Sequence, residues 1–323
     1  MFDIIIATYN RFEKALALAQ QILSIDSTEI KQICIVDSTD HQSIYSGTEI
    51  KIKHILSPHK NQPYQRYLGF QNTLSPYVIF LDDDMEIVNT TFLKKVHEIL
   101  QKGYAGVAIH FEDKHQNTSL NKIAKSAFNK NKLAFGRFMN WFTAYPNLPD
   151  GILGLCGVRG KQPAEGGITD FVSGGAFAAQ RIMLYQNFNF ELFNLYNQKI
   201  GKGEDAMIGY TLAKAGRVYY LPDLLFYHND QQDSAYSINQ YAFAKRVTFS
   251  RKYLSLEKTR LDDKLEIYAQ VHFHWHTMWR VLGLIINYTL HKTDSRKQML
   301  NGAIAGWKLA ASYRFKFKSA CTI

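Results

Sequence analysis

The sequence predicts an α/β fold in which a mostly parallel sheet with flanking helices is followed by a helical C-terminal region. Over residues 1–237, short apolar runs alternate with stretches whose apolar residues recur at helical spacing. Such alternation is typical of parallel strands joined by helices that cover both faces of the sheet. From residue 238 to residue 323 the apolar spacing is helical. We therefore expect a sheet domain over residues 1–237 and a helical region over residues 238–323.

The predicted elements follow one another in a regular order. Apolar runs predict strands over 4–8, 33–36, 50–56, 78–81, 105–111 and 217–221. Helical spacing predicts helices over 11–23, 62–74, 92–102, 206–214, 239–254, 264–290 and 296–312. The run 171–177 predicts a strand that enters a glycine pair, where backbone can approach a ligand closely. Residues 112–168 lack a clear period, which indicates a functional insertion in the sheet domain.

Composition narrows the class of protein. The chain has 323 residues, of which 46% are hydrophobic, enough for a large core. Its formal net charge of +10 favours an anionic partner: a phosphorylated substrate, an acidic membrane surface or nucleic acid. Three distant cysteines without CxxC spacing favour a reducing compartment. Because no signal-peptide pattern or bilayer-length apolar run is present, we expect a cytoplasmic protein.

An acidic triplet ends one predicted strand. Asp82, Asp83 and Asp84 follow the apolar run 77–81, and an apolar core could not accept three unpaired carboxylates. Asp82 and Asp84 can both offer oxygen to one hard divalent cation, Mg²⁺ or Mn²⁺, and that cation can hold a diphosphate. The structural alternative is a solvated acidic turn at the end of a strand.

Three further ionisable side chains stand at the ends of predicted elements. Glu204 and Asp205 precede the helix over 206–214, where the positive end of the helix dipole favours an ionised carboxylate. A carboxylate kept charged there can take a proton from a hydroxyl, although simple stabilisation of the helix is the alternative. His228 follows the apolar run 224–227 and is either a hydrogen-bonded core residue or a further ligand of an oxygen-rich metal site.

Taken in order, these motifs resemble those of the family 2 glycosyltransferases, which are inverting enzymes of the GT-A fold. The similarity runs from residue 2 to about residue 228. The motifs that carry it are the first nucleotide-contacting strand and turn (5–11), the base-binding strand end (35–38), a form of the Ala-Arg-Asn-x-Gly helix (65–69), the acidic metal motif (80–84), the donor-sugar loop (173–176) and the Glu-Asp pair (203–205).

The resemblance implies a role for each matched residue. Those that would bind the donor nucleotide-sugar are Thr8, Tyr9, Asn10, Arg11, Asp37, Arg66, Asp82, Asp83, Gly174 and Gly175. Asp84, together with Asp82 and His228, would hold Mg²⁺ or Mn²⁺. Asp205 would be the catalytic base, and Glu204 would bind the acceptor or orient Asp205.

The resemblance also implies an activity. The protein would be a metal-dependent glycosyltransferase of the hexosyltransferase type, with a nucleoside-diphosphate sugar as donor and a UDP-sugar favoured. The sugar would pass to a hydroxyl of a glycan or a lipid-linked acceptor in surface polysaccharide synthesis, and the insertion over 112–168 would bind that acceptor.

The basic, aromatic C-terminal region predicts a second contact surface. It favours docking on an anionic membrane surface, which would place the protein at the inner face of the cell membrane, or packing against the catalytic domain or another subunit. We expect no nucleic-acid partner. Two other interpretations stay open. One is a basic membrane- or nucleic-acid-binding protein on an inactive GT-A scaffold. The other is a sugar-phosphate nucleotidyltransferase, which would be expected to have a glycine-rich N-terminal loop, although residues 8–11 contain no glycine.

Overall fold

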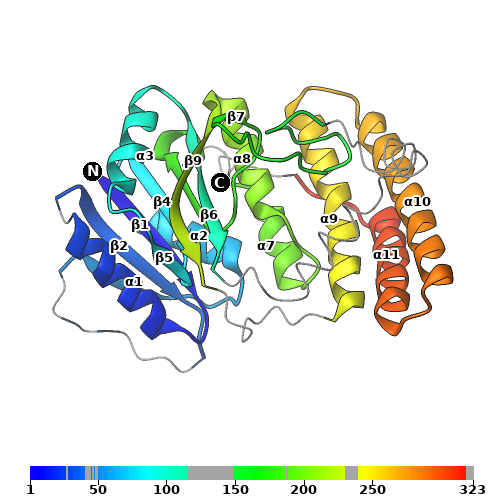
Figure 1. The fold of residues 1–323 in the computed structure, drawn as a ribbon, viewed down its shortest axis with the longest axis horizontal. Helices are drawn as coiled ribbons and strands as arrows, with labels where there is room; N and C mark the ends of the chain where they lie inside the picture. Colours follow the sequence, from blue (N-terminus) through cyan, green and yellow to red (C-terminus); the bar gives the residue numbers. More distant parts are fainter. Residues whose placement is uncertain are drawn as a thin grey trace.

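A nine-stranded sheet forms the centre of the protein (Figure 1). The computed structural model describes residues 1–26, 28–40, 45, 47, 50–114, 148–185, 188–229 and 239–317. The strands are β1 (Phe2–Thr8), β2 (Ile30–Asp37), β3 (Ile52–Leu56), β4 (Tyr77–Asp82), β5 (Met85–Ile87), β6 (Gly106–Asp113), β7 (Gly167–Thr169), β8 (Ala176–Gln180) and β9 (Val218–His228). They are arranged in the order β3-β2-β1-β4-β8-β6-β9-β5, and β7 pairs with β9.

The sheet runs mostly in one direction. The pairs β1–β2, β1–β4, β2–β3 and β6–β9 are parallel, whereas β8 is antiparallel to both β4 and β6. The short strands β5 and β7 are antiparallel to β9. Six of the nine described strands therefore share a direction, which confirms the predicted α/β class with a mostly parallel sheet.

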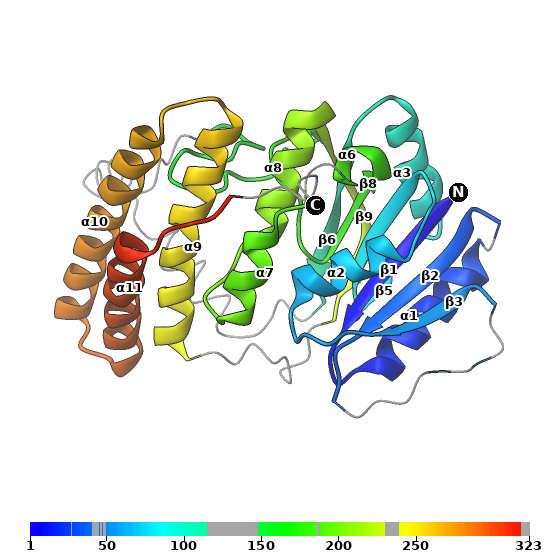
Figure 2. The same cartoon turned by 180° about the vertical axis from the view of Figure 1, so that it is seen from behind.

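Helices cover both faces of the sheet (Figures 1 and 2). Those of the sheet domain are α1 (Phe12–Ile25), α2 (Gln62–Gln71), α3 (Phe92–Gln101), α6 (Arg181–Tyr185), α7 (Phe190–Asn197) and α8 (Glu204–Gly216). Successive side chains of a strand point to opposite faces. Accordingly, Ile4 and Ile6 of β1 are buried with α1 and α3, whereas Ile5 is buried in a second core with α2 and α8. The apolar run of β1 thus serves two hydrophobic layers at once.

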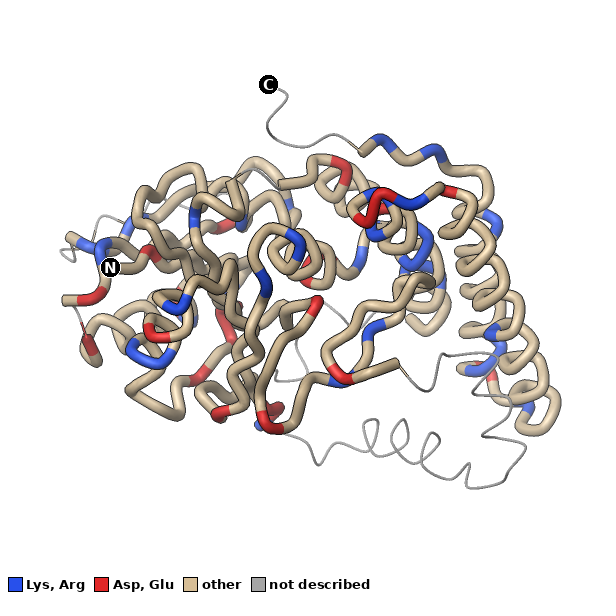
Figure 3. The backbone as a smooth tube through the Cα atoms, turned by 90° about the horizontal axis from the view of Figure 1, so that it is seen from above, with Lys and Arg blue, Asp and Glu red and all other residues tan. Residues whose placement is uncertain are grey.

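Three long helices follow the sheet domain: α9 (Gln240–Leu261), α10 (Glu266–Leu290) and α11 (Asp294–Ser312). Two glycines let α11 lie directly on α9, since a Cβ on Gly302 would come within 2.2 Å of the Tyr241 carbonyl oxygen and one on Gly306 within 2.4 Å of that of Lys245. Residues 239–317 carry 14 Lys and Arg against five Asp and Glu, and Figure 3 shows the basic residues along these helices. Every predicted helix of this region is present.

The aromatic residues that follow α11 face the protein rather than solvent. Tyr313 and Phe315 pack against Phe249 with ring centroids 5.2 and 5.4 Å apart. Phe317 stacks on Tyr253 at 5.6 Å. Residues 313–317 therefore pack on α9, within the predicted helical region itself, and docking on a membrane, the catalytic domain or another subunit stays a prediction.

Some predicted elements differ from the structure. The prediction of a strand over 171–177 is wrong, because β8 begins at Ala176, after the glycine pair rather than before it. The strand expected over 217–221 continues to His228, since the missing amide hydrogen of Pro222 falls where the β6–β9 register shifts. Of the segment expected as an insertion, residues 115–147 lie outside the described residues, and the domain boundary at 237 stays a prediction.

Candidate functional site

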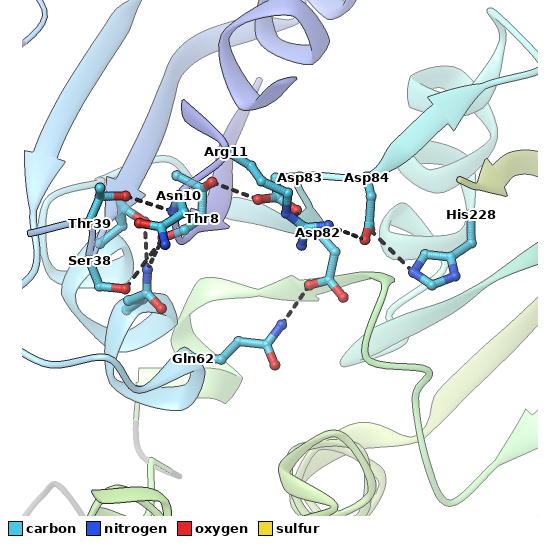
Figure 4. A network of polar contacts seen from close by, with 12 residues as sticks. Thr8, Asn10, Arg11, Ser38, Thr39, Gln62, Asp82, Asp83, Asp84 and His228 are labelled. Atoms are coloured by element: carbon cyan, nitrogen blue, oxygen red, sulfur yellow. Dashed lines mark hydrogen bonds and ion pairs between the residues drawn. The ribbon is translucent and has the colours of Figure 1, made fainter. Parts of the chain in front are cut away.

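The candidate site lies beyond the ends of β1 and β4, where Asp83 is turned inward (Figure 4). The Thr8 hydroxyl donates to Asp83 Oδ2 at 2.6 Å, and Arg11 Nη2 lies 2.7 Å from Asp83 Oδ1. Burial raises the pKa of Asp83 to about 6, although the Thr8 hydrogen bond and the Arg11 charge oppose the rise. Thr8, Arg11 and Asp83, all predicted to bind donor, are thus brought together, with Asp83 holding the other two.

Asp84 shares Arg11 with Asp83 and also contacts His228. Its Oδ2 lies 3.1 Å from Arg11 Nη1, and its Oδ1 lies 3.3 Å from His228 Nε2 (Figure 4). The other ring nitrogen of His228, Nδ1, lies 3.1 Å from Asp113 Oδ1. The carboxylate of Asp84 raises the pKa of His228 to about 9 against the effect of burial. Burial raises the pKa of Asp84, but His228 and Arg11 outweigh it and keep that pKa below its usual value.

Asp84 and His228 fit a divalent cation as one oxygen and one nitrogen ligand. Asp84 Oδ1 is buried and its ion-pair partner, His228 Nε2, lies 3.3 Å away, so a metal between these two atoms would have to displace the Nε2 proton of His228. Within the described residues no group of three or more His, Cys, Asp or Glu is arranged to hold a metal. A cation here would take its remaining ligands from water and a diphosphate, as Mg²⁺ commonly does. Asp82, the third predicted ligand, accepts hydrogen bonds at its Oδ1 from Gln62 and Arg66, and its role as a metal ligand stays a prediction.

Arg66 connects the acidic triplet to the start of α8. Its side chain is only 1% exposed, and Nη2 lies 2.9 Å from Asp82 Oδ1 while Nη1 lies 3.1 Å from Glu204 Oε1. Nη2 also donates to the Gly174 carbonyl oxygen at 2.5 Å. Burial would lower the pKa of Arg66, but the charges of Asp82 and Glu204 raise it above its usual value. A permanently charged guanidinium therefore holds the strand end, the glycine loop and the helix start together.

Glu204 and Asp205 begin α8, and the left-handed φ of 84° at Gly203 sets the turn that precedes them. Burial and the neighbouring charge of Asp205 raise the pKa of Glu204 to about 7. Burial also raises the pKa of Asp205, but Arg159, whose Nη1 lies 2.7 Å from Asp205 Oδ2, outweighs it and lowers that pKa below its usual value. The two adjacent carboxylates therefore differ: Asp205 is ionised at neutral pH, whereas Glu204 is close to its titration point.

A cavity of about 320 Å³ opens beside Asp205. Its lining residues are Gln62, Arg159, Tyr196, Lys202, Gly203, Glu204, Asp205, Phe243 and Arg246. Gln62 also donates to Asp82 Oδ1 at 2.8 Å, so the cavity reaches the acidic triplet. Gly174 forms the nearby backbone, since a Cβ added to it would lie 3.6 Å from Asp205 Oδ2. Asp82 itself does not line the cavity, but it is joined through Gln62 to the cavity that Asp205 lines.

The remaining predicted residues hold the loops after the strands. The Asp37 side chain is fully buried, and its Oδ1 accepts hydrogen bonds from the Thr39 amide at 2.8 Å and hydroxyl at 2.6 Å. The Thr39 hydroxyl accepts from the Asn10 amide at 2.7 Å, which joins the ends of β1 and β2. Lys60 Nζ lies 5.0 Å from the centre of the Tyr9 ring. Asp37 therefore fixes this loop, and contact with a nucleobase stays a prediction.

Gly175 belongs to the packing below the site. Its carbonyl oxygen accepts a hydrogen bond from the Asp82 amide at 2.9 Å. A Cβ on it would lie 2.1 Å from Met85 Cε and 2.9 Å from the Phe111 ring. A larger residue would therefore displace side chains around the end of β4.

Among the cavity residues that sequence reasoning missed are one amide and three cations: Gln62, Arg159, Lys202 and Arg246. Lys202 lies inside the Gly201–Gly203 turn that precedes Glu204, so its position next to the predicted base was available from the sequence. Arg159 lies in the segment without period, and Arg246 lies on a helix 41 positions after Asp205. Neither of these two residues carries a local sequence signal.

Comparison with known proteins gives a family match. Residues 3–161 match the sequence model described as glycosyl transferase family 2. No curated protein matches the chain.

Three of the solved structures that are similar to this chain are the following. Residues 1–349 of S. aureus TarS are 13% identical, with a TM-score of 0.45 over 98% of this chain and 93% of that chain. The mannosyltransferase PcManGT from Pyrobaculum calidifontis, solved with GDP-Man and Mn²⁺, is 11% identical, with a TM-score of 0.47 over 96% and 87%. GalNAc-T7, solved with UDP, GalNAc and Mn²⁺, is 13% identical, with a TM-score of 0.46 over 86% and 56%.

Proposed function

This chain belongs to glycosyltransferase family 2 through its residues 3–161, and we propose that it moves a sugar from a nucleoside-diphosphate sugar to an acceptor hydroxyl with inversion at the anomeric carbon. The observation that supports this most is the position of Arg66. Its guanidinium contacts Asp82 at 2.9 Å and Glu204 at 3.1 Å, so the proposed donor side and the proposed base lie in one site.

The donor would bind beyond the ends of β1 and β4. Asp84 and His228 would hold a divalent cation, Mg²⁺ or Mn²⁺, which supplies charge neutralisation for the departing diphosphate. Arg11, now ion-paired with Asp83 and Asp84, would remain beside the diphosphate as a fixed positive charge.

The acceptor would bind in the cavity beside Asp205. Arg159 keeps the pKa of Asp205 low enough for an ionised carboxylate at neutral pH, which is the form that accepts a proton. The hydroxyl oxygen would attack the anomeric carbon as its proton passes to Asp205 and the bond to the diphosphate breaks. Attack on the face opposite the leaving group inverts that carbon through a transition state with oxocarbenium character. Glu204, held by Arg66, would orient Asp205 or contact the acceptor.

The finer assignments rest on the family resemblance. We propose a UDP-sugar as donor, a hexosyl group as the transferred unit, and a glycan or lipid-linked acceptor in surface polysaccharide synthesis.

Peripheral contact with a membrane, or with a second copy, would use α10. Exposed apolar residues follow that helix at alternating spacings of three and four: Tyr268, Val271, Trp275, Met278, Leu282 and Ile285. Among the described residues no helix is long and apolar enough to cross a membrane. Flotation with anionic vesicles and sedimentation equilibrium without them distinguish the two contacts.

Two variants test the catalytic assignment. Asp205→Asn is expected to keep donor binding and lose transfer, and full turnover by this variant would remove the assigned base. Asp84→Ala is expected to weaken nucleotide binding in the presence of Mn²⁺, and calorimetry that shows unchanged affinity would contradict the ligand assignment. Lys94→Gln on the exposed surface of α3 serves as the control for both.

A further inference from the structure

We infer that the acceptor carries a phosphate group and that Lys202 and Arg246 bind it. The inference rests on the proposed function, because it takes the cavity beside Asp205 as the acceptor side. Both cations line that cavity, and Lys202 lies three positions before Asp205 in the chain.

The backbone orients Arg246 toward the cavity. Its Nε and Nη2 donate to the Gly201 carbonyl oxygen at 3.2 and 2.8 Å. Among the described residues, its Nη1 has no hydrogen-bond partner. Lys202 Nζ lies 4.8 Å from the centre of the Phe243 ring, which forms part of the cavity wall. Two half-buried cations thus converge on one space from α9 and from the turn before α8.

These two cations have no acidic partner. Within the described residues, the carboxylates of the cavity are already paired, Asp205 with Arg159 and Glu204 with Arg66, and neither Lys202 nor Arg246 lies within 4.0 Å of a carboxylate. Burial, and then the charge of Arg246, lower the pKa of Lys202. An anion bound between them would compensate both charges, and charged hydrogen bonds from Lys and Arg are typical of phosphate sites.

The anion belongs to the acceptor rather than to the donor. The donor diphosphate is proposed to bind at Asp84 and His228, neither of which lines the cavity, whereas Lys202 and Arg246 both do. Lys202 and Arg246 lie on the side of the proposed base, from which the attacking hydroxyl approaches. A phosphate held there would position a nearby hydroxyl against Asp205. The phosphate can belong to a lipid carrier or to a phosphodiester of a polymer.

Binding of inorganic phosphate tests the site directly. Phosphate is expected to bind wild type and Lys94→Gln equally, and Lys202→Gln about tenfold more weakly, the effect of losing one hydrogen bond from a charged group. Arg246→Lys keeps the positive charge but loses the planar guanidinium with its several N–H donors. It is expected to weaken phosphate binding less than Arg246→Gln. The inference would be overturned, whether or not the enzyme is active, if wild type and Lys202→Gln bind phosphate with equal affinity. It would also be overturned if phosphate saturates neither protein.

Acceptor specificity gives the second measurement. With glycerol phosphate and glycerol as competing acceptors, the ratio of their kcat/KM values is expected to favour the phosphate in wild type and to fall about tenfold in Lys202→Gln. Glucuronate tests a carboxylate in place of phosphate. Dodecyl phosphate micelles and diglyceryl phosphate distinguish the lipid and phosphodiester sources.

Failure of the phosphate inference and failure of the proposed function give different results. A wild-type enzyme that consumes donor and uses glycerol as well as glycerol phosphate would overturn this inference alone. A protein that binds phosphate through Lys202 but consumes no nucleotide-sugar would contradict the proposed function.

Discussion

Replacing Arg66 by Met should reveal how much the central guanidinium stabilises the site. Met keeps a long apolar side chain but removes the charge that lies between Asp82 and Glu204. Removing one partner of a buried ion pair costs about 3–5 kcal/mol, because the other charge is left uncompensated. The lower end applies here, about 3 kcal/mol at pH 8, since the side chain of Asp82 is 23% exposed and retains some hydration.

The cost should depend on pH. Burial already raises the pKa of Glu204 to about 7, and the charge of Arg66 opposes that rise. Without Arg66, Glu204 takes up a proton more readily, which relieves the buried charge. We therefore expect Arg66→Met to lose less stability at pH 6 than at pH 8, and Arg66→Met with Glu204→Gln to recover part of the loss at pH 8.

Urea unfolding at both pH values measures these differences. Arg181→Met is the matched control, because Arg181 donates to Thr73 Oγ1 and the Phe70 carbonyl oxygen, both at 3.0 Å, and has no carboxylate within ion-pair distance among the described residues. Arg181→Met should lose less free energy of unfolding than Arg66→Met, and its loss should be the same at both pH values. A loss under about 1 kcal/mol for Arg66→Met at pH 8, or an equal loss at both pH values, would refute the reasoning.

Three further predictions concern two buried positions of α8 and one exposed position of α10. Between its ordinary pKa of 4.5 and about 7, Glu204 holds a proton in the folded state that the unfolded state has released, so stability should fall as pH rises through this window, by about 3 kcal/mol. Glu204→Gln should flatten this decline in urea titrations, and an unchanged slope would contradict the assignment. Gly209→Ala should destabilise by about 1–3 kcal/mol, because its Cβ would meet the backbone of Val172 at 2.4 Å and Phe171 at 2.5 Å. Gly283→Ala in α10, with nothing within 4 Å, should instead raise the urea midpoint by the equivalent of about 0.5–1 kcal/mol.

The buried elements of the sheet could be predicted because their signal is local. The run 4–8 is fully or nearly fully buried on both faces, so its residues are apolar without alternation and identify β1 directly. The long helices α9, α10 and α11 were predicted for a similar reason, since helical spacing persists over many residues. The ends of such elements depend on the next turn and were less accurate.

The glycine loop shows why some elements could not be predicted. The run 171–177 is apolar enough for a strand, yet pairing with β4 begins only at Ala176. The Gly175 carbonyl oxygen accepts from the Asp82 amide just before that point. This contact joins residues 93 positions apart, so no local pattern reports it.

The acids of the candidate site could be predicted, as could Arg11 and Arg66, but the cations that line the cavity were not. The acidic triplet and the pair at the start of α8 stand at element ends, where a charged residue has a recognisable position. Arg159 and Arg246 meet them only through tertiary contacts, whereas Lys202 lies in the turn just before Glu204. Arg66 was predicted to contact nucleotide, but the fold buries it against two carboxylates, which gives it a structural part that the motif did not indicate.

The distribution of paired and unpaired charges explains how one site can receive two different substrates. Arg66 and Arg159 neutralise the carboxylates at the centre of the site, so neither substrate meets a strong net charge there. The proposed ligand groups lie at the two ends: Asp84 with His228 at the proposed donor end, and, in the cavity, Lys202 with Arg246, which have no carboxylate partner among the described residues. A cation would favour the first end and an anion the second. If the ends attract opposite charges as proposed, a free phosphate group would be directed away from the proposed metal position, and an acceptor that carries one would bind with its hydroxyl toward Asp205.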